Sequence, residues 1–133
     1  MENTASKNLK SVLVVDDDPE LLSGLRRSLR PWAEDFEFLF ICGGAAGLQT
    51  LRRRHVDVIV TDLLMPIIQG QSLISEGRKL RPHSAFIALS GNANAETVEK
   101  LTEAHVVYLA KSVTAETLMT AVEDAIDWLN TRS

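Results

Sequence analysis

Residues 56–70 read Val-Asp-Val-Ile-Val-Thr-Asp-Leu-Leu-Met-Pro-Ile-Ile-Gln-Gly. The apolar, β-branched run at 58–60 is typical of a buried strand, and it stops abruptly at the carboxylate of Asp62. A turn with Met65 and Pro66 follows, and Gly70 comes just before the next helical pattern. We therefore predict a strand whose carboxyl end presents Asp62 to a surface crevice.

The rest of the chain repeats this alternation. Apolar runs predict strands at 11–15, 36–42, 85–89 and 106–110, and helical spacing predicts helices at 19–30, 45–54, 71–80, 95–104 and 114–130. Asp18 is the expected N-cap of the first helix, with Pro19 at its first position. Strict alternation indicates an α/β fold: a doubly wound five-stranded parallel sheet with five helices covering its two faces. Among such sheets the strand order 2-1-3-4-5 is the common solution.

The length of 133 residues fits one domain, and we expect a flexible tail at 1–10 and a single domain at 11–130. The net charge of −4 argues against a general nucleic-acid surface, and the basic run Arg52 to Arg54 is explained by the end of a helix. No segment resembles a signal peptide or a membrane span, so we expect a cytoplasmic protein that contacts no membrane. The single Cys42 ends an apolar run, and we interpret it as a small core residue.

Polar side chains follow four of the predicted strands: Asp16 and Asp17, Asp62, Ser90 and Lys111. Taken singly, each has an ordinary explanation as a helix cap, a turn residue or a solvated lysine. In a sheet of this order, however, the carboxyl ends of these strands meet at one edge. Crowded carboxylates repel one another and take up protons unless a cation joins them. An all-oxygen site of this kind suits Mg²⁺, whereas zinc would favour His or Cys ligands that this edge lacks.

The same residues supply what phosphoryl transfer requires. Lys111 offers a compact positive charge for an anion, and Ser90 offers a hydroxyl donor. With a metal ion, these groups would position and neutralise a phosphoryl group beside Asp62. Asp62 would then be the attacking oxygen and would form an aspartyl phosphate.

At this point the chain resembles the receiver domain of two-component response regulators, the CheY-like superfamily. The resemblance covers roughly residues 9–129, in the family's order and spacing, and implies the flavodoxin-like receiver fold. The matching motifs are Val14-Val15-Asp16-Asp17 with Pro19, Thr61-Asp62-Leu63-Leu64-Met65-Pro66 with Gly70, Leu89-Ser90-Gly91, and Tyr108-Leu109-Ala110-Lys111.

The resemblance implies that Asp62 accepts a phosphoryl group from a sensor histidine kinase or a histidine phosphotransferase. It also implies a bound Mg²⁺, for which Mn²⁺ can substitute. Asp17 would bind this ion directly, Asp16 largely through water, and Asp62 and the backbone carbonyl of Leu64 would complete the protein ligands.

Ser90 and Lys111 would contact the phosphoryl group, and Tyr108 matches the family's switch aromatic, which turns inward as Ser90 is drawn toward the phosphate. The alternative is that Tyr108 simply packs on the last helix. The face made by helix 95–104, strand 106–110 and helix 114–130 is the family's usual surface for a partner or a homodimer. Trp128 on this last helix is a candidate contact residue, or it is partly buried against the sheet. We expect no output domain within the chain, and the segment 89–111 looks similar to receivers that precede HD-type output domains.

The chain departs from the family where Ser112 follows Lys111 in place of the usual proline. A non-proline cis bond costs ~3–4 kcal/mol, so we predict a trans bond between these two residues. Leu64 and Asn92 occupy positions that tune dephosphorylation in the family. Neither side chain activates a hydrolytic water well, which favours a slowly decaying phosphate.

Two other functions fit part of the pattern. One is a receiver-like binding module that works without phosphorylation, which would leave the grouped acids, hydroxyl and lysine without a purpose. The other is a phosphatase of the haloacid dehalogenase type, with Asp16 and Asp18 as its paired acids. Pro19 replaces the usual residue of that motif, and the chain has no room for a substrate cap. We therefore expect a phosphoacceptor signalling domain and not an enzyme with its own substrate.

Overall fold

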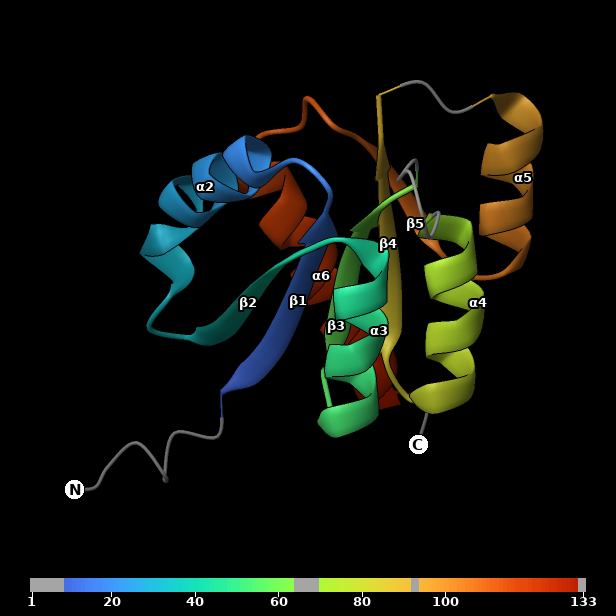
Figure 1. Ribbon diagram of the computed structural model, residues 1–133, viewed down its shortest axis with the longest axis horizontal. Helices are drawn as coiled ribbons and strands as arrows, with labels where there is room; N and C mark the ends of the chain where they lie inside the picture. The colour runs from blue at the N-terminus through green and yellow to red at the C-terminus, as the bar shows by residue number, and fades with distance from the viewer. Residues whose placement is uncertain (1–8, 64–69, 92–93, 132–133) are drawn as a thin grey trace.

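The computed structural model describes residues 9–63, 70–91 and 94–131. Within these residues, five strands form one parallel sheet in the order β2-β1-β3-β4-β5 (Figure 1). The strands are β1 (Lys10–Asp16), β2 (Phe36–Cys42), β3 (Val58–Asp62), β4 (Ala85–Ser90) and β5 (Val107–Ala110). The predicted α/β class and strand order are both confirmed, and β1 and β3, which end in acids, are neighbours.

Five α-helices alternate with these strands in the described part of the chain. They are α2 (Pro19–Ser28), α3 (Gly44–Arg53), α4 (Gly70–Leu80), α5 (Ala95–Glu103) and α6 (Ala115–Thr131). Each lies within two residues of its predicted range. The largest difference is at the end of α2, where a short 3₁₀-helix, η1 (Arg30–Trp32), follows because a proline disfavours α-helical backbone in the residue before it. None of the described helices has the length and apolar character needed to cross a membrane.

The two faces of the sheet bury separate apolar clusters. Leu13 and Val15 of β1 pack with residues of α3, α4 and α5, whereas Val12 and Val14 pack with residues of α2 and α6. This division follows from the alternation of side chains along a strand. Figure 1 shows α3 and α4 in front of the sheet and α6 behind it. Residues 58–60 of β3 are fully buried, as expected for a strand covered on both faces.

The start of α2 is fixed by its predicted cap. The carboxylate of Asp18 accepts a hydrogen bond from the N–H of Glu20 at 3.0 Å, and Pro19 occupies the first turn. This cap satisfies one of the unpaired N–H groups at the helix start. It therefore holds the short loop in which Asp17 lies.

The end of α5 carries a left-handed residue that is not glycine. His105 has a φ of 61°, and its N–H donates to the carbonyl of Thr102 at 3.0 Å. The N–H of Val106 donates to the carbonyl of Leu101 at 2.8 Å, which completes a Schellman motif in which glycine is the usual residue. The ring of His105 stacks on Trp128 of α6, with ring centroids 6.3 Å apart. This contact ties the end of α5 to α6.

One prediction about the core is wrong. Cys42 is exposed, and its Sγ lies 3.5 Å from the carbonyl oxygen of Asp17. Cys42 is the last residue of β2, which is an edge strand of the sheet. An apolar run therefore ends here at the rim of the sheet and not inside it.

Asp57 joins the beginnings of β1 and β3 at the edge opposite the strand ends. Its carboxylate accepts hydrogen bonds from the N–H of Ser11 at 2.8 Å and the hydroxyl of Ser11 at 3.2 Å. Its other oxygen lies 2.9 Å from Nε2 of His55. Burial alone would raise the pKa of Asp57, but these bonds outweigh burial, and the pKa lies below its ordinary value.

We expect Asp57→Asn to lower the free energy of unfolding at neutral pH by about 1–3 kcal/mol, because the carboxylate is held by hydrogen bonds. A lowered pKa gives stability that is present above the ordinary value of 3.8 and is lost as the pH falls through the lower pKa of the folded state. The difference between wild type and variant should therefore shrink in acid. Urea denaturation across this pH range measures it. Asp35→Asn, at an exposed acid, is the matched control with little effect at any pH. If the difference in unfolding free energy between wild type and Asp57→Asn stayed constant as the pH fell, this role for Asp57 would be contradicted.

Candidate functional site

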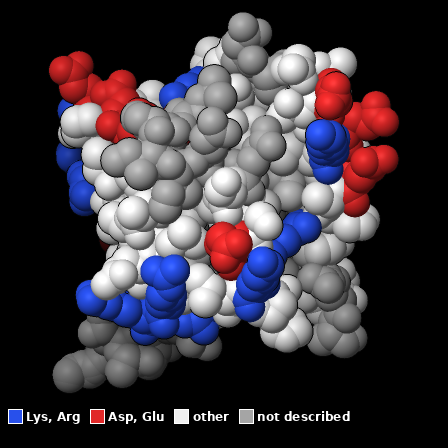
Figure 2. Space-filling model, turned by 45° about the vertical axis from the view of Figure 1, so that its right-hand side comes forward, with Lys and Arg blue, Asp and Glu red and all other residues white. Residues whose placement is uncertain are grey.

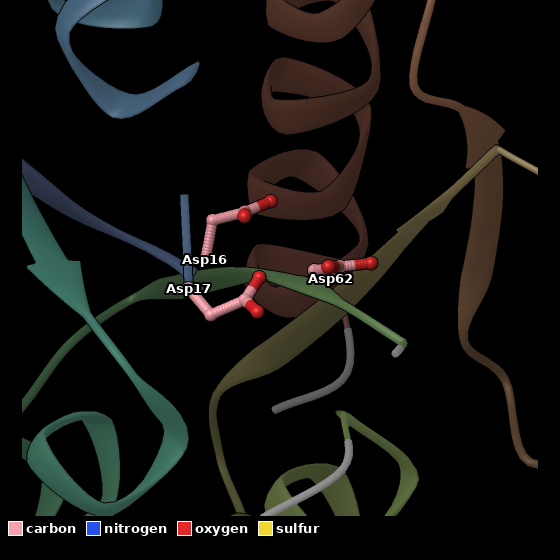
Figure 3. A group of neighbouring side chains, drawn as sticks. All are labelled: Asp16, Asp17 and Asp62. Atoms are coloured by element: carbon pink, nitrogen blue, oxygen red, sulfur yellow. The ribbon is translucent and has the colours of Figure 1, made fainter. Parts of the chain in front are cut away.

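The carboxyl edge of the sheet brings together the acids that the sequence placed at strand ends. Asp16 and Asp62 are 1% and 3% exposed, whereas Asp17 is exposed. Figure 3 shows the three side chains beside one another at the ends of β1 and β3. One oxygen from each lies within 4.8 Å of the other two. The predicted acidic cluster therefore exists in the folded chain.

Backbone hydrogen bonds continue the sheet into the loops around this cluster. The N–H of Leu63 donates to the carbonyl of Leu89 at 3.0 Å, and the N–H of Lys111 donates to the carbonyl of Ser90 at 3.1 Å. On the other side, the N–H of Gly43 donates to the carbonyl of Asp16 at 2.9 Å. Gly43 has a φ of 98°, which glycine adopts without strain. These bonds fix the backbone on which the acids and the lysine stand.

Lys111 lies between the two buried acids. Its Nζ is 3.0 Å from Oδ2 of Asp62 and 3.3 Å from Oδ2 of Asp16. Burial would lower the pKa of Lys111, but the hydrogen bond to Asp62 and the charges of both acids outweigh burial and raise it. The ammonium is therefore charged at neutral pH and partly neutralises the cluster.

One carboxylate oxygen of Asp16 accepts no hydrogen bond from the part of the chain that the structure describes. Its Oδ1 accepts the N–H of Asp18 at 2.9 Å. Its Oδ2 is buried and accepts no aligned hydrogen bond from the described residues, although Nζ of Lys111 lies within ion-pair distance. Burial raises the pKa of Asp16, and the nearby charge of Asp62 adds to this effect. A carboxylate oxygen that accepts no hydrogen bond and lies beside two further carboxylates is suited to bind a divalent cation.

A contact between Ser90 and Tyr108 joins β4 to β5, the last strand of the sheet. Ser90 ends β4 and is 1% exposed. The hydroxyl of the half-buried Tyr108 donates to the carbonyl of Ser90 at 3.4 Å, a long hydrogen bond. The register of β4 and β5 places Ser90 beside Ala110, immediately before Lys111. The hydroxyl and the lysine predicted for the site therefore do lie at the same edge.

The peptide bond after Lys111 has the geometry that the sequence predicts. The described peptide bonds include no cis bond, so the bond between Lys111 and Ser112 is trans and that prediction is confirmed. Leu64 and Asn92 lie outside the described residues, and their predicted roles stay predictions.

Sequence reasoning missed two features of the site. It did not predict that Nζ of Lys111 pairs with both Asp16 and Asp62 in the unmodified chain, whereas the contact of Lys111 with an anion stays a prediction. It also placed Cys42 in the core, whereas the register of β1 and β2 sets Cys42 beside Asp16 at the carboxyl edge. Strand order was the available signal, because it makes β2 an outer strand and β1, β3 and β4 inner ones.

Comparisons with known proteins agree with this fold. A family model for the response regulator receiver domain matches residues 12–123. The transcriptional regulatory protein GlrR of Escherichia coli K12 is 33% identical over 117 residues, which cover 87% of this chain and 26% of GlrR. The chain thus spans about a quarter of the length of this curated relative.

Solved structures agree as well. A CheY-like receiver domain from Methanospirillum hungatei superimposes with a TM-score of 0.85 at 24% identity, covering 95% of this chain and all of that one. The signal receiver domain of an HD domain-containing protein from Pseudomonas fluorescens gives a TM-score of 0.84 at 23% identity, covering 94% of this chain and all of that one. At these identities the likeness shows the fold alone.

The fold and the site together define a doubly wound α/β protein with a carboxylate cluster and a lysine at the carboxyl edge of its sheet. The chain belongs to the response regulator receiver domain family.

We expect a divalent cation to bind this cluster and to raise the melting temperature, because a ligand that binds only the folded chain stabilises it. Asp17→Asn should weaken Mn²⁺ binding, measured by titration calorimetry, by at least about tenfold. Asp18→Asn is the matched control, since asparagine still caps α2 and residue 18 lies outside the cluster. Equal losses in the two variants, or no binding by the wild type, would count against a metal site here.

Proposed function

We propose that this chain is the phosphoacceptor of a two-component phosphorelay and that Asp62 receives the phosphoryl group. The observation that carries the proposal is the buried Asp62 carboxylate with Nζ of Lys111 at 3.0 Å and two further carboxylates beside it. In the proposed reaction an Asp62 oxygen attacks phosphorus and a new O–P bond forms. The P–N bond of a phosphohistidine breaks, and the imidazole nitrogen keeps the electron pair. The donor is a sensor histidine kinase or a histidine phosphotransferase.

The acids around Asp62 support a magnesium ion as cofactor, with Mn²⁺ as a substitute. Asp17, Asp16, Asp62 and the backbone carbonyl of Leu64 would hold it, and the ion would neutralise charge on the transferring phosphoryl group. Two observations favour this assignment. Oδ2 of Asp16 accepts no hydrogen bond from the described residues, and one oxygen of each of the three carboxylates lies within 4.8 Å of the other two. Residue 64 enters only by the family resemblance.

Lys111 and Ser90 would hold the phosphoryl oxygens once Asp62 is modified. Nζ of Lys111 now pairs with the Asp62 carboxylate, so a phosphoryl group there would give the ammonium a new anionic partner. A shift of Ser90 toward the phosphate would disturb its contact with the hydroxyl of Tyr108. Tyr108 lies on β5 between α5 and α6, and these three elements form the proposed output surface.

The proposed output is binding and not substrate turnover. GlrR is named as a transcriptional regulatory protein, and a signal received here would pass to an output domain or protein of some kind, an HD-type domain being one candidate. Homodimerisation through the output surface is a second candidate output. The apolar Leu64 and the amide of Asn92 favour a slowly decaying phosphate.

We expect acetyl phosphate with a magnesium salt to add the mass of one phosphate to the wild-type chain. Asp62→Asn should abolish this gain, because an amide does not replace the attacking carboxylate. Asp35→Asn, the same change at an exposed acid, should be modified as the wild type is. Intact-protein mass spectrometry measures all three, with circular dichroism to check folding.

Two results would overturn the proposal. Incorporation that persists in Asp62→Asn would place the phosphate elsewhere. A folded wild type that binds metal but gains no phosphate would favour a receiver-like binding module that works without phosphorylation.

A further inference from the structure

A groove of about 490 Å³ lies between α5, β5 and α6. Its apolar lining includes Val98 of α5, Val107 and Tyr108 of β5, and Ala125 and Trp128 of α6. β5 is the last strand of the sheet, and Val107 and Trp128 keep 44% and 40% of their surfaces exposed. Large apolar side chains that gather in an exposed groove are typical of a surface that another molecule covers.

The two helices that flank this groove carry the chain's excess of negative charge. α5 and α6 hold seven of the 18 acidic residues and one of the 14 basic residues, so the remaining 11 acids and 13 bases carry a net charge of +2. All seven acids are exposed, and Asp124 lines the groove. The one base, Lys100, lies 3.4 Å from Glu96 on its own helix.

Figure 2 shows where the charged side chains lie on one face of the molecule. Lys and Arg side chains form a row along the lower edge, and acidic side chains form groups at the upper left, near the centre and at the right, where α5 lies. The group at the right belongs to α5, which borders the groove.

This charge decides between two kinds of occupant. In a symmetric dimer the same patch meets itself, so the acids of α5 and α6 would lie against the equally acidic α5 and α6 of the second copy. Like charges across an interface are costly, whereas a positively charged partner is attracted and steered toward the groove. A groove bounded by two helices also suits a third helix that inserts one apolar face.

We propose that the groove binds a cationic amphipathic helix of a partner protein. The apolar face of this helix contacts Val107 and Trp128, and its Lys and Arg side chains lie against Asp124 and the other acids of α5 and α6. The inference names the occupant of the proposed output surface. The groove is present in the unmodified chain, so binding of the helix can be tested without phosphorylation. Only a link between phosphorylation and this binding rests on the proposed function.

The test uses fluorescent synthetic peptides and the full, unmodified chain. One peptide is an amphipathic helix with leucine on one face and lysine on the other, the second has glutamate in place of lysine, and the third has the first composition scrambled so that no apolar face forms. We expect only the first to bind in fluorescence anisotropy, with an affinity that falls as salt is added.

Variants locate the contact. Asp124→Lys should weaken binding of the lysine peptide by about tenfold, and Val107→Ser by about fivefold, because the first reverses a charge at the rim and the second removes an apolar contact. Glu34→Lys is the matched charge control at an exposed acid outside α5 and α6, and it should change the affinity by less than about twofold. Thermal melts check that each variant folds.

Several results would overturn the inference. Equal binding of the glutamate or scrambled peptide, or no binding at all, would exclude a cationic helix. An equal loss in Glu34→Lys would show general charge attraction only. A dimer in sedimentation that Val107→Ser disrupts would assign the groove to a second copy of the chain. The peptide test uses the unmodified chain and needs no phosphate donor, so this test and the phosphorylation test can fail separately.

Discussion

The buried carboxylates of Asp16 and Asp62 are the constraint on which the rest of the site depends. Burying a charge is costly unless a partner lies beside it, and removing one member of a buried pair costs ~3–5 kcal/mol. Here one ammonium, that of Lys111, lies 3.0 and 3.3 Å from two carboxylates, and Asp17 adds a third acid nearby. The cluster therefore keeps excess negative charge. A proton on Asp16 or a divalent cation can remove this excess, so protonation and metal binding compete.

The fold explains why these groups meet. β1 and β3 are neighbours at the centre of the sheet, so the acids at their carboxyl ends lie side by side. Helices on both faces bury the apolar side chains of β1, β3 and β4, whereas the polar groups of the site lie at the carboxyl ends of these strands. β5 is an outer strand that leads into Lys111 at its end and carries Tyr108 and the exposed Val107 along its length. The proposed site and the proposed groove thus meet at β5. Lys111, which pairs with Asp62, directly follows this strand, and Val107 begins it.

Most of the fold could be predicted because strands and helices alternate with clear periods, and the strand-end positions of Asp62 and Lys111 followed from it. The misses concern positions whose environment depends on tertiary structure. Cys42 is exposed because β2 is an edge strand, which an apolar run does not reveal. His105 adopts a left-handed conformation and stacks on Trp128, although glycine is the usual residue at such a helix end. The pairing of one lysine with two acids likewise depends on packed side chains and not on spacing.

The most direct test of Asp62 as phosphoacceptor is chemical trapping of the modified residue. Borohydride reduces an acyl phosphate on an aspartate to an alcohol, which converts that residue to homoserine. The chain would be treated with acetyl phosphate and a magnesium salt, reduced, digested and sequenced by mass spectrometry. We predict homoserine at position 62 and at no other aspartate. Homoserine at Asp16 or Asp17, or its absence from a folded and metal-bound chain, would contradict the assignment.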